Sequence, residues 1–139
     1  MVGHCLPAGQ AGFENAGLQV ALAGAVQSLG KIKSMNKIHI AIGVSDVVRS
    51  VEDYTRRLGC PPKIVVPNEY ALWRTDSINF SIRHDTQGAG ELRHLGWEDP
   101  SALQFTKETD VNGIVWERFS EELQAKEIKD TWPQSAPKL

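Results

Sequence analysis

Two histidines, His39 and His94, occupy matching places in two similar stretches of the chain. Residues 37–43 read Lys-Ile-His-Ile-Ala-Ile-Gly, and residues 92–98 read Leu-Arg-His-Leu-Gly-Trp-Glu. In both stretches a small residue, Ala41 or Gly96, follows two positions after the histidine. Imidazole nitrogen is a common ligand for divalent transition metals. Two histidines on the inner faces of related strands therefore predict a metal-binding pair.

The elements around His39 follow from the spacing of the apolar residues. Residues 37–44 alternate strictly, with isoleucines and Val44 on one face and His39 beside small residues on the other, which predicts a strand. Ser45 or Asp46 then supplies a helix N-cap, and an apolar stripe predicts a helix as far as Leu58. Gly59, directly after Leu58, and the prolines at positions 61 and 62 predict the end of that helix.

The remaining elements suggest that this strand-helix unit is duplicated. Short strands are predicted at residues 63–66, 70–74 and 78–83, which completes one β-α-β-β-β module over residues 36–85. The second module, residues 91–132, begins with a strand at 92–97. We expect a helix from Pro100 to about Asp110, a strand at 114–119 and one more strand at 126–132. The second module is therefore predicted to be incomplete.

Length and composition place the chain among ordinary globular proteins. A chain of 139 residues predicts one hydrophobic core, which we assign to residues 35–132, followed by a tail at 133–139. Residues 1–34 are rich in Gly, Ala and Gln and are predicted to be an N-terminal extension, loose or weakly helical, with a short docked helix as the alternative.

The charge and cysteine content narrow the possible partners and the compartment. A net charge of −2 without a run of Lys or Arg argues against a nucleic-acid partner. No apolar stretch reaches the ~18 residues that span a bilayer, so we expect no membrane association. The two cysteines, Cys5 and Cys60, are too few for a disulfide framework. These features favour a cytoplasmic protein.

The motifs resemble those of the vicinal oxygen chelate superfamily, which includes glyoxalase I, bleomycin-resistance proteins and extradiol dioxygenases. The local likeness lies in His39-Ile-Ala-Ile-Gly-Val-Ser-Asp46, in Ser50-Val-Glu-Asp-Tyr54 and in Leu58-Gly59. Further on, Ile78-Asn-Phe-Ser81 and Leu92-Arg-His-Leu-Gly96 look most like the cadmium-induced and organoarsenical-lyase branch. The resemblance covers roughly residues 36–132. It implies an α+β fold in which paired β-α-β-β-β modules form a curled sheet around a cleft.

The resemblance also implies a ligand set, with His39 and His94 at the positions of its two histidine ligands. A divalent metal, Fe, Zn, Ni or Mn, would be completed by a carboxylate from the last strand of the second module. That strand is not evident, so the chain is expected to be truncated at its C-terminus and to lack its third ligand. Glu117, Glu98 or a carboxylate of a partner subunit are the substitutes. The organoarsenical lyases also need a thiol pair, and the absence of cysteine after Cys60 argues against that activity.

Three further residues are candidates for contact with a small-molecule ligand. Asn79 and Ser81 share a strand face and either line the cleft or meet solvent, while Trp73 either packs in the core or stacks on a ligand.

Three functions are consistent with these residues. One is a metal-dependent lyase or dioxygenase whose small substrate chelates the metal through neighbouring oxygens. Another is a non-catalytic drug-binding protein of the same fold, and the third is a truncated copy without independent activity. Proteins of this type are usually homodimers, and we expect the same here.

Overall fold

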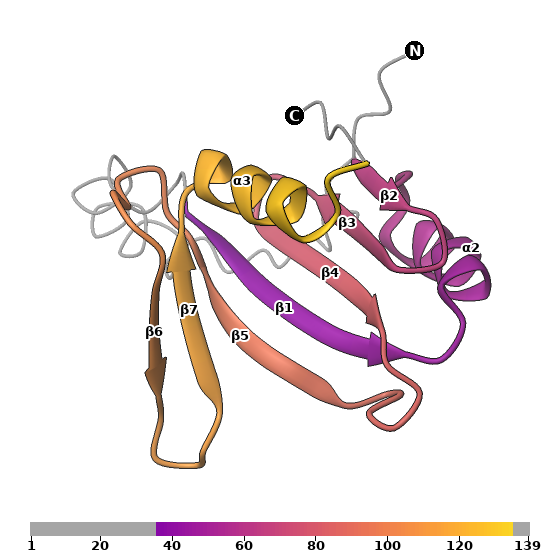
Figure 1. Cartoon of the computed structure of the whole chain (residues 1–139), viewed down its shortest axis with the longest axis horizontal. Helices are drawn as coiled ribbons and strands as arrows, with labels where there is room; N and C mark the ends of the chain where they lie inside the picture. Colours follow the sequence, from indigo (N-terminus) through magenta and orange to yellow (C-terminus); the bar gives the residue numbers. More distant parts are fainter. Residues whose placement is uncertain (1–35, 135–139) are drawn as a thin grey trace, which may run out of the picture.

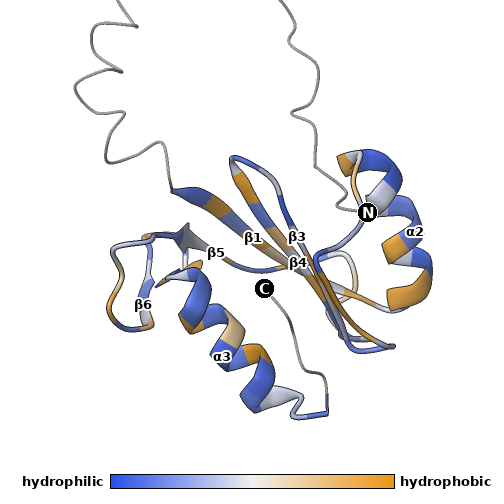
Figure 2. Ribbon diagram, turned by 90° about the horizontal axis from the view of Figure 1, so that it is seen from above, coloured by the Kyte–Doolittle hydropathy of each residue, from blue (hydrophilic) through white to orange (hydrophobic). Residues whose placement is uncertain are grey.

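The computed structural model describes residues 36–134, which form a mixed α+β fold with one sheet and two helices. The sheet curls without closing, and one helix lies on each of its faces (Figures 1 and 2). The expectations for residues 1–34 and for most of the tail at 133–139 lie outside the described residues. Within the described part, no helix is long and apolar enough to cross a membrane.

Two parallel strand pairs form the middle of the seven-stranded sheet, whose order is β2-β3-β4-β1-β5-β7-β6. β1 (Lys37–Val44) runs parallel to β4 (Ile78–His84) and antiparallel to β5 (Leu92–Glu98). β5 in turn runs parallel to β7 (Val115–Phe119). The outer strands are β2 (Ile64–Val66) and β3 (Tyr70–Arg74) at one side and β6 (Thr106–Thr109) at the other. The predicted strands of the first half of the chain are confirmed.

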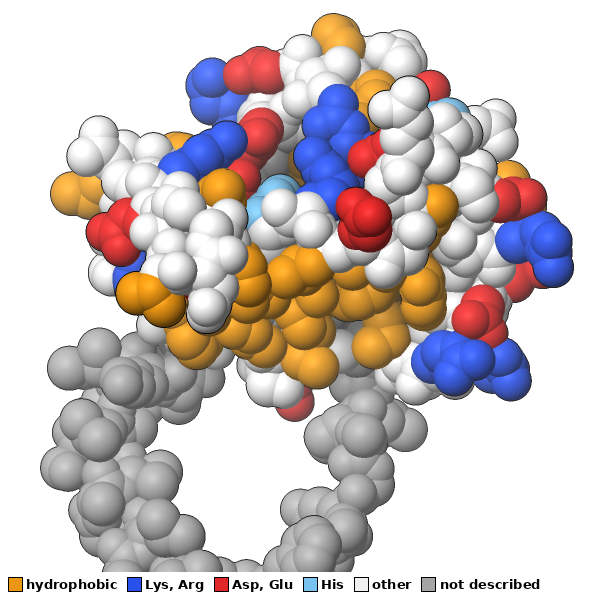
Figure 3. All heavy atoms as spheres, turned by 90° about the horizontal axis from the view of Figure 1, so that it is seen from below, with side chains coloured by type: hydrophobic (Ala, Val, Ile, Leu, Met, Phe, Trp, Pro, Cys, Tyr) orange, Lys and Arg blue, Asp and Glu red, His pale blue; other side chains and the backbone are white. Residues whose placement is uncertain are grey.

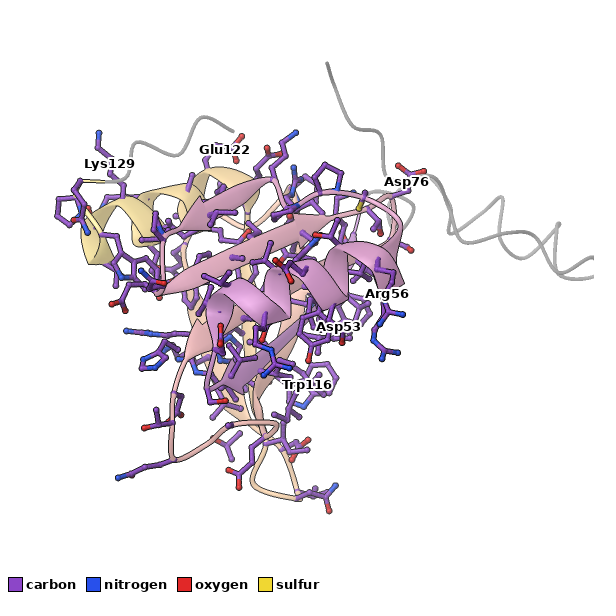
Figure 4. All side chains as sticks on the ribbon, turned by 90° about the vertical axis from the view of Figure 1, so that its right-hand side faces the viewer. Asp53, Arg56, Asp76, Trp116, Glu122 and Lys129 are labelled. Carbon is purple, nitrogen blue, oxygen red and sulfur yellow. The ribbon has the colours of Figure 1, made fainter. Side chains whose placement is uncertain are left out.

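Helix α2 (Val47–Leu58) covers the convex face beside β3 and β4, as the apolar stripe predicts. The Asp46 carboxylate accepts a hydrogen bond from the Arg49 backbone N–H and caps the helix. Gly59, with φ of 76°, ends it in the left-handed region. Figure 4 shows Asp53 and Arg56 on this helix pointing away from the sheet. Its inner side packs on a core that includes Val44, Val47, Cys60, Ala71, Trp73 and Ile82.

Helix α3 (Glu121–Thr131) lies on the concave face, where the sequence analysis placed a strand at residues 126–132. That strand prediction is wrong. The Ser120 hydroxyl accepts a hydrogen bond from the Leu123 N–H and caps a helix. Gln124, Ile128 and Trp132 then recur every fourth residue and are buried, with Ile128 and Trp132 packing against β2 and β3. The sheet is therefore covered on both faces in its first half.

The helix predicted from Pro100 to Asp110 is also wrong. The Asp99 carboxylate accepts hydrogen bonds from the backbone N–H and the hydroxyl of Ser101, which closes a turn instead of starting a helix. The chain continues as an open loop, in which Leu103 is 95% exposed, and then forms β6. On β5, Leu92 and Trp97 remain 43% and 37% exposed. Figure 3 shows a continuous apolar surface in the view from below.

The packing beneath α2 gives a test of the fold. Ile82 is fully buried, so Ile82→Val should lower the free energy of unfolding by about 0.5–1.5 kcal/mol and Ile82→Ala by about 2–5 kcal/mol. Val111→Ala is the control, because Val111 is 98% exposed and its truncation should change stability by less than about 0.5 kcal/mol. Urea unfolding followed by tryptophan fluorescence measures both. Equal effects at the two positions would contradict the described core.

Candidate metal centre

His39, His94 and Glu117 meet on the concave face of three neighbouring strands. β1 and β5 pair Ile40 with Leu95 and Ala41 with His94, so the two histidines are diagonal neighbours on one face. β5 and β7 pair Gly96 with Glu117, which brings the carboxylate to the same face. Both the alternation and the register are therefore needed to assemble the group.

The distances within this group suit a divalent metal. His39 Nε2 lies 2.9 Å from His94 Nε2, and His94 Nε2 lies 3.0 Å from Glu117 Oε2. One ligand atom from each of the three residues lies within 4.8 Å of the others. Two nitrogens bound at ~2.1 Å and at right angles would be about 3.0 Å apart, which is the spacing of a facial site. The group could therefore hold a metal ion on one side and leave the opposite positions open.

Asn79 determines which nitrogen of His39 points into the site. His39 Nδ1 lies 2.8 Å from the Asn79 side-chain oxygen and 3.2 Å from its backbone carbonyl oxygen. Both oxygens only accept hydrogen bonds, so Nδ1 carries the proton and donates it. Nε2 is then the acceptor nitrogen, and its lone pair is directed toward His94 Nε2. This is the tautomer that a metal ligand requires.

A buried polar network holds Asn79 in turn. The Asn79 amide donates to Glu98 Oε1 and to Gln124 Oε1, both at 2.8 Å. Arg74 donates two hydrogen bonds of 2.8 Å to the Glu98 carboxylate and a third, of 3.0 Å, to Glu121. Because Glu98 can only accept while ionised, the amide group of Asn79 must face it and the amide oxygen must face His39. The ring is thus oriented from outside the site.

Burial and charge set the protonation of the site. Burial lowers the pKa of His39, and the neighbouring His94 lowers it further, so the imidazole is neutral at pH 7. Burial alone would raise the pKa of Glu117, but its hydrogen bond to His94 and its electrostatic interactions with His94, His39 and Lys107 outweigh burial, so the net shift is downward. A neutral imidazole and an ionised carboxylate are the forms that bind metals.

Gly96 allows β7 to approach β5 closely enough to deliver Glu117. A Cβ atom at Gly96 would lie 2.4 Å from the Glu117 carbonyl oxygen, which belongs to the backbone and cannot rotate away. Any larger residue would push β7 outward. The small residue two positions after His94 is therefore required by the neighbouring strand.

A cavity of about 310 Å³ opens beside the three side chains. Phe119 contacts the His39 ring edge-on, with ring centroids 4.9 Å apart, and Phe105 stacks on Phe119 at 5.4 Å. Helix α3 forms the opposite wall, on which burial and the charge of Glu117 raise the pKa of the Glu127 carboxyl. In the view from below, Lys and Arg side chains lie beside a histidine above the apolar surface (Figure 3).

The other residues predicted for the site do not all reach the cavity. Ser81 lines the cavity, whereas Asn79 lies behind His39 and is fully buried. Trp73 is fully buried in the core beneath α2, where its ring packs against Tyr54 and Phe80, so it does not reach the cavity. Glu98 is engaged by Arg74 and supports Asn79. Of the proposed substitutes within the chain, Glu117 is the carboxylate that joins the histidines.

Sequence reasoning missed Gln124, Arg83 and Arg93. Arg83 shares its strand face with Ser81, so the alternation along β4 was a usable signal. Gln124 could have been found only by recognising α3, whose signal was Ser120 before two acidic residues. Arg93 precedes His94 and by alternation belongs to the opposite face.

Comparison with known proteins supports the fold but identifies neither a family nor a function. No protein-family model matches the sequence, and no curated protein does so either. The fold is similar to the crystal structure of a hypothetical protein from Staphylococcus aureus, with a TM-score of 0.50 and 11% sequence identity. The match covers 70% of this chain and 39% of the other, so the chain spans well under half of that protein. At this identity the likeness concerns the fold alone.

The network behind His39 predicts a pH dependence. Burial by itself would raise the pKa of Glu98, but hydrogen bonds from Arg74 and Asn79 bring it below its ordinary value of 4.5. A carboxylate whose pKa is lowered by folding stabilises the fold above its ordinary pKa, and this contribution is lost as pH falls through the lower folded value. Glu98→Gln should therefore cost roughly 1.5–3 kcal/mol at pH 7 and show a smaller further loss below about pH 4.5.

Urea unfolding at a series of pH values measures this effect. Glu122→Gln is the matched control, because Glu122 lies on the outer side of α3 and points away from the sheet (Figure 4). It should leave both the stability at pH 7 and the acid limb unchanged. An acid limb of the same depth in Glu98→Gln and in the unmutated protein would show that Glu98 is not held by this network.

Proposed function

We propose that the chain is a metal-dependent enzyme of the vicinal oxygen chelate type, a lyase or dioxygenase whose small substrate chelates the metal through neighbouring oxygens. The observation that carries the proposal is the convergence of His39, His94 and Glu117 beside a cavity. Two histidines and one carboxylate form a facial ligand set that leaves positions for substrate. Iron, zinc, nickel and manganese are all compatible with these donors.

The strand register supports an internal repeat behind this site. A two-fold axis through the paired residues Ile40 and Leu95 would relate His39 to His94 and Ala41 to Gly96. The parallel neighbours of the last two residues are Ser81 on β4 and Glu117 on β7. Glu117 is thus the second-half counterpart of Ser81.

The sequence analysis expected the second module to lack the strand that carries the third metal ligand. The repeat gives a different expectation. The element that stands beside β5 and carries the carboxylate is present as β7. A helix on the convex face and an outermost strand are the parts of a second β-α-β-β-β module that the described residues lack. The proposal therefore needs no carboxylate from a partner subunit.

The side chains around the cavity have distinct tasks in this mechanism. A bound metal would supply Lewis-acid or oxygen-activating chemistry at the open positions. Asn79 keeps the His39 lone pair directed inward, and Glu117 contributes the negative charge. Phe105 and Phe119 form an apolar wall on one side of the cavity, which would limit the access of water to a bound metal. The Glu127 carboxyl, whose pKa is raised by burial and by Glu117, is the group on α3 suited to exchanging a proton with substrate.

Metal content tests the proposal directly. The unmutated full chain, purified without chelator, should hold close to one transition-metal ion per chain, and His39→Ala, His94→Ala and Glu117→Ala should each remove it. Asn79→Ala should weaken metal affinity by about 10–100-fold, because it releases the His39 ring. Inductively coupled plasma mass spectrometry gives the occupancy, and titration with Zn²⁺ gives the affinity.

His84→Ala is the control, since His84 is exposed at the end of β4 and does not line the cavity. It should retain full metal content. Substoichiometric metal in the unmutated protein that none of the three ligand substitutions lowers would refute the enzyme proposal. Circular dichroism of each variant separates loss of metal from loss of fold.

The aromatic wall favours a second candidate function, binding of a small molecule without a metal. Phe105, Phe119 and Trp132 line the cavity, and flat apolar side chains suit a planar drug-like ligand. The chain would then sequester its ligand rather than transform it. Titration of the metal-free protein with planar ligands, followed by tryptophan fluorescence, would detect this function, and an unchanged signal would count against it.

A homodimer remains part of the proposal. The exposure of Leu92 and Trp97 on β5 supports it, because large apolar side chains gathered on one face favour self-association. Light scattering coupled to size exclusion should give twice the chain mass, and Trp97→Glu should shift the protein toward monomer. A monomeric mass at micromolar concentration would contradict this part alone.

A further inference from the structure

We propose that Arg83 and Arg93 form an oxyanion-binding subsite in the same cavity, so that the ligand is a small anion with a carboxylate or phosphoryl group. Both side chains line the cavity that holds His39, His94 and Glu117. The inference rests on the proposed function only for the opposite, metal-chelating end of the ligand.

A β-bulge turns Arg93 into the cavity. β1 and β5 pair Ala41 with His94, and the next pair is Ile42 with Leu92, so Arg93 is left out of the ladder. An extra residue of this kind rotates its side chain away from the regular alternation. Arg93 and His94 therefore both line the cavity although they are adjacent in sequence. The bulge is what adds a cation to the metal-site face.

Arg83 reaches the cavity by regular alternation from β4. It pairs with Gly43 of β1, and β1 separates β4 from β5, so the two arginines extend from strands on either side of a residue without a side chain. The Arg83 guanidinium lies 5.2 Å from the centroid of the Trp132 ring. This contact orients the group without neutralising its charge.

The ion pairs of the described residues leave these two arginines out. Arg56 and Arg57 pair with Asp53, Arg74 pairs with Glu98 and Glu121, and Arg118 pairs with Asp99. Between residues 36 and 134 no salt bridge involves Arg83 or Arg93. Both are half-buried, and burial together with the like charge of Arg83 lowers the pKa of Arg93. Two guanidinium groups that line one cavity are a typical arrangement for binding an oxyanion.

Besides the two histidines, the other acidic and basic side chains that line the cavity are Lys107, Glu117 and Glu127, and the charge of Glu117 also acts on Arg93. Lys107 Nζ lies 3.5 Å from Glu117 Oε1 and forms an ion pair with it. Burial raises the pKa of the Glu127 carboxyl, which interacts electrostatically with both Glu117 and Arg83. The cavity therefore contains both a candidate metal-ligand set and an arginine pair. A ligand that fits both has chelating oxygens at one end and an oxyanion at the other.

Calorimetric titration with malonate, inorganic phosphate and the neutral analogue malonamide tests the subsite on the metal-free full chain. Malonate or phosphate should bind, and malonamide should not. Arg83→Gln and Arg93→Gln should each weaken binding about tenfold, and the double variant should abolish it. Preference for phosphate over malonate would assign the phosphoryl group, and the reverse would assign the carboxylate.

Arg49→Gln is the matched control, because Arg49 is an exposed arginine on α2 away from the cavity. It should leave the affinity unchanged. Glu117→Ala should keep anion binding even where it loses metal, so failure of the metal site and failure of the arginine subsite give different results. Equal binding of malonate and malonamide, or unchanged malonate affinity in the double arginine variant, would overturn the inference.

Discussion

The chain of hydrogen bonds from Arg74 through Glu98 and Asn79 to His39 is the interaction on which the site depends. Glu98 is 3% exposed and Asn79 is fully buried, so an unpaired group in this chain would carry the full cost of desolvation. Each member is satisfied only in one orientation, and the last of them is the His39 imidazole. The same network reaches α3 through Gln124 and Glu121, and thereby couples the position of the helix to the orientation of the ring.

The two faces of the sheet explain why the cavity lies where it does. Helix α2 covers the convex face of the first half, where Ile42 and Val44 of β1 and Phe80 and Ile82 of β4 belong to the core beneath it or pack against that core. Helix α3 then covers part of the concave face and forms a wall over the metal-site residues. Because the loop after Asp99 replaces a second convex helix, Leu92 and Trp97 on β5 remain exposed.

Two local features of β5 bring side chains to the cavity: the glycine at position 96 and the β-bulge at Arg93. Gly96 lets β7 approach, which places Glu117 beside the histidines, and the bulge at Arg93 turns a guanidinium toward the same cavity. Both lie within three residues of His94 along the chain. A single strand thus supplies one candidate metal ligand, the space for a second and a guanidinium that faces the cavity; bulges are frequent beside functional sites.

The sequence by itself determined the faces of β1 and β4, those of β5 except at the bulge of Arg93, the first helix and the pairing of His39 with His94, because these follow from local alternation and capping. It did not determine α3 or the loop after Asp99, where the capping serine and an aspartate-closed turn competed with weak strand and helix patterns. Only the tertiary structure decided that Glu117 joins the site and that Trp73 does not. The register between β5 and β7 and the packing under α2 are long-range properties, and no local spacing encodes them.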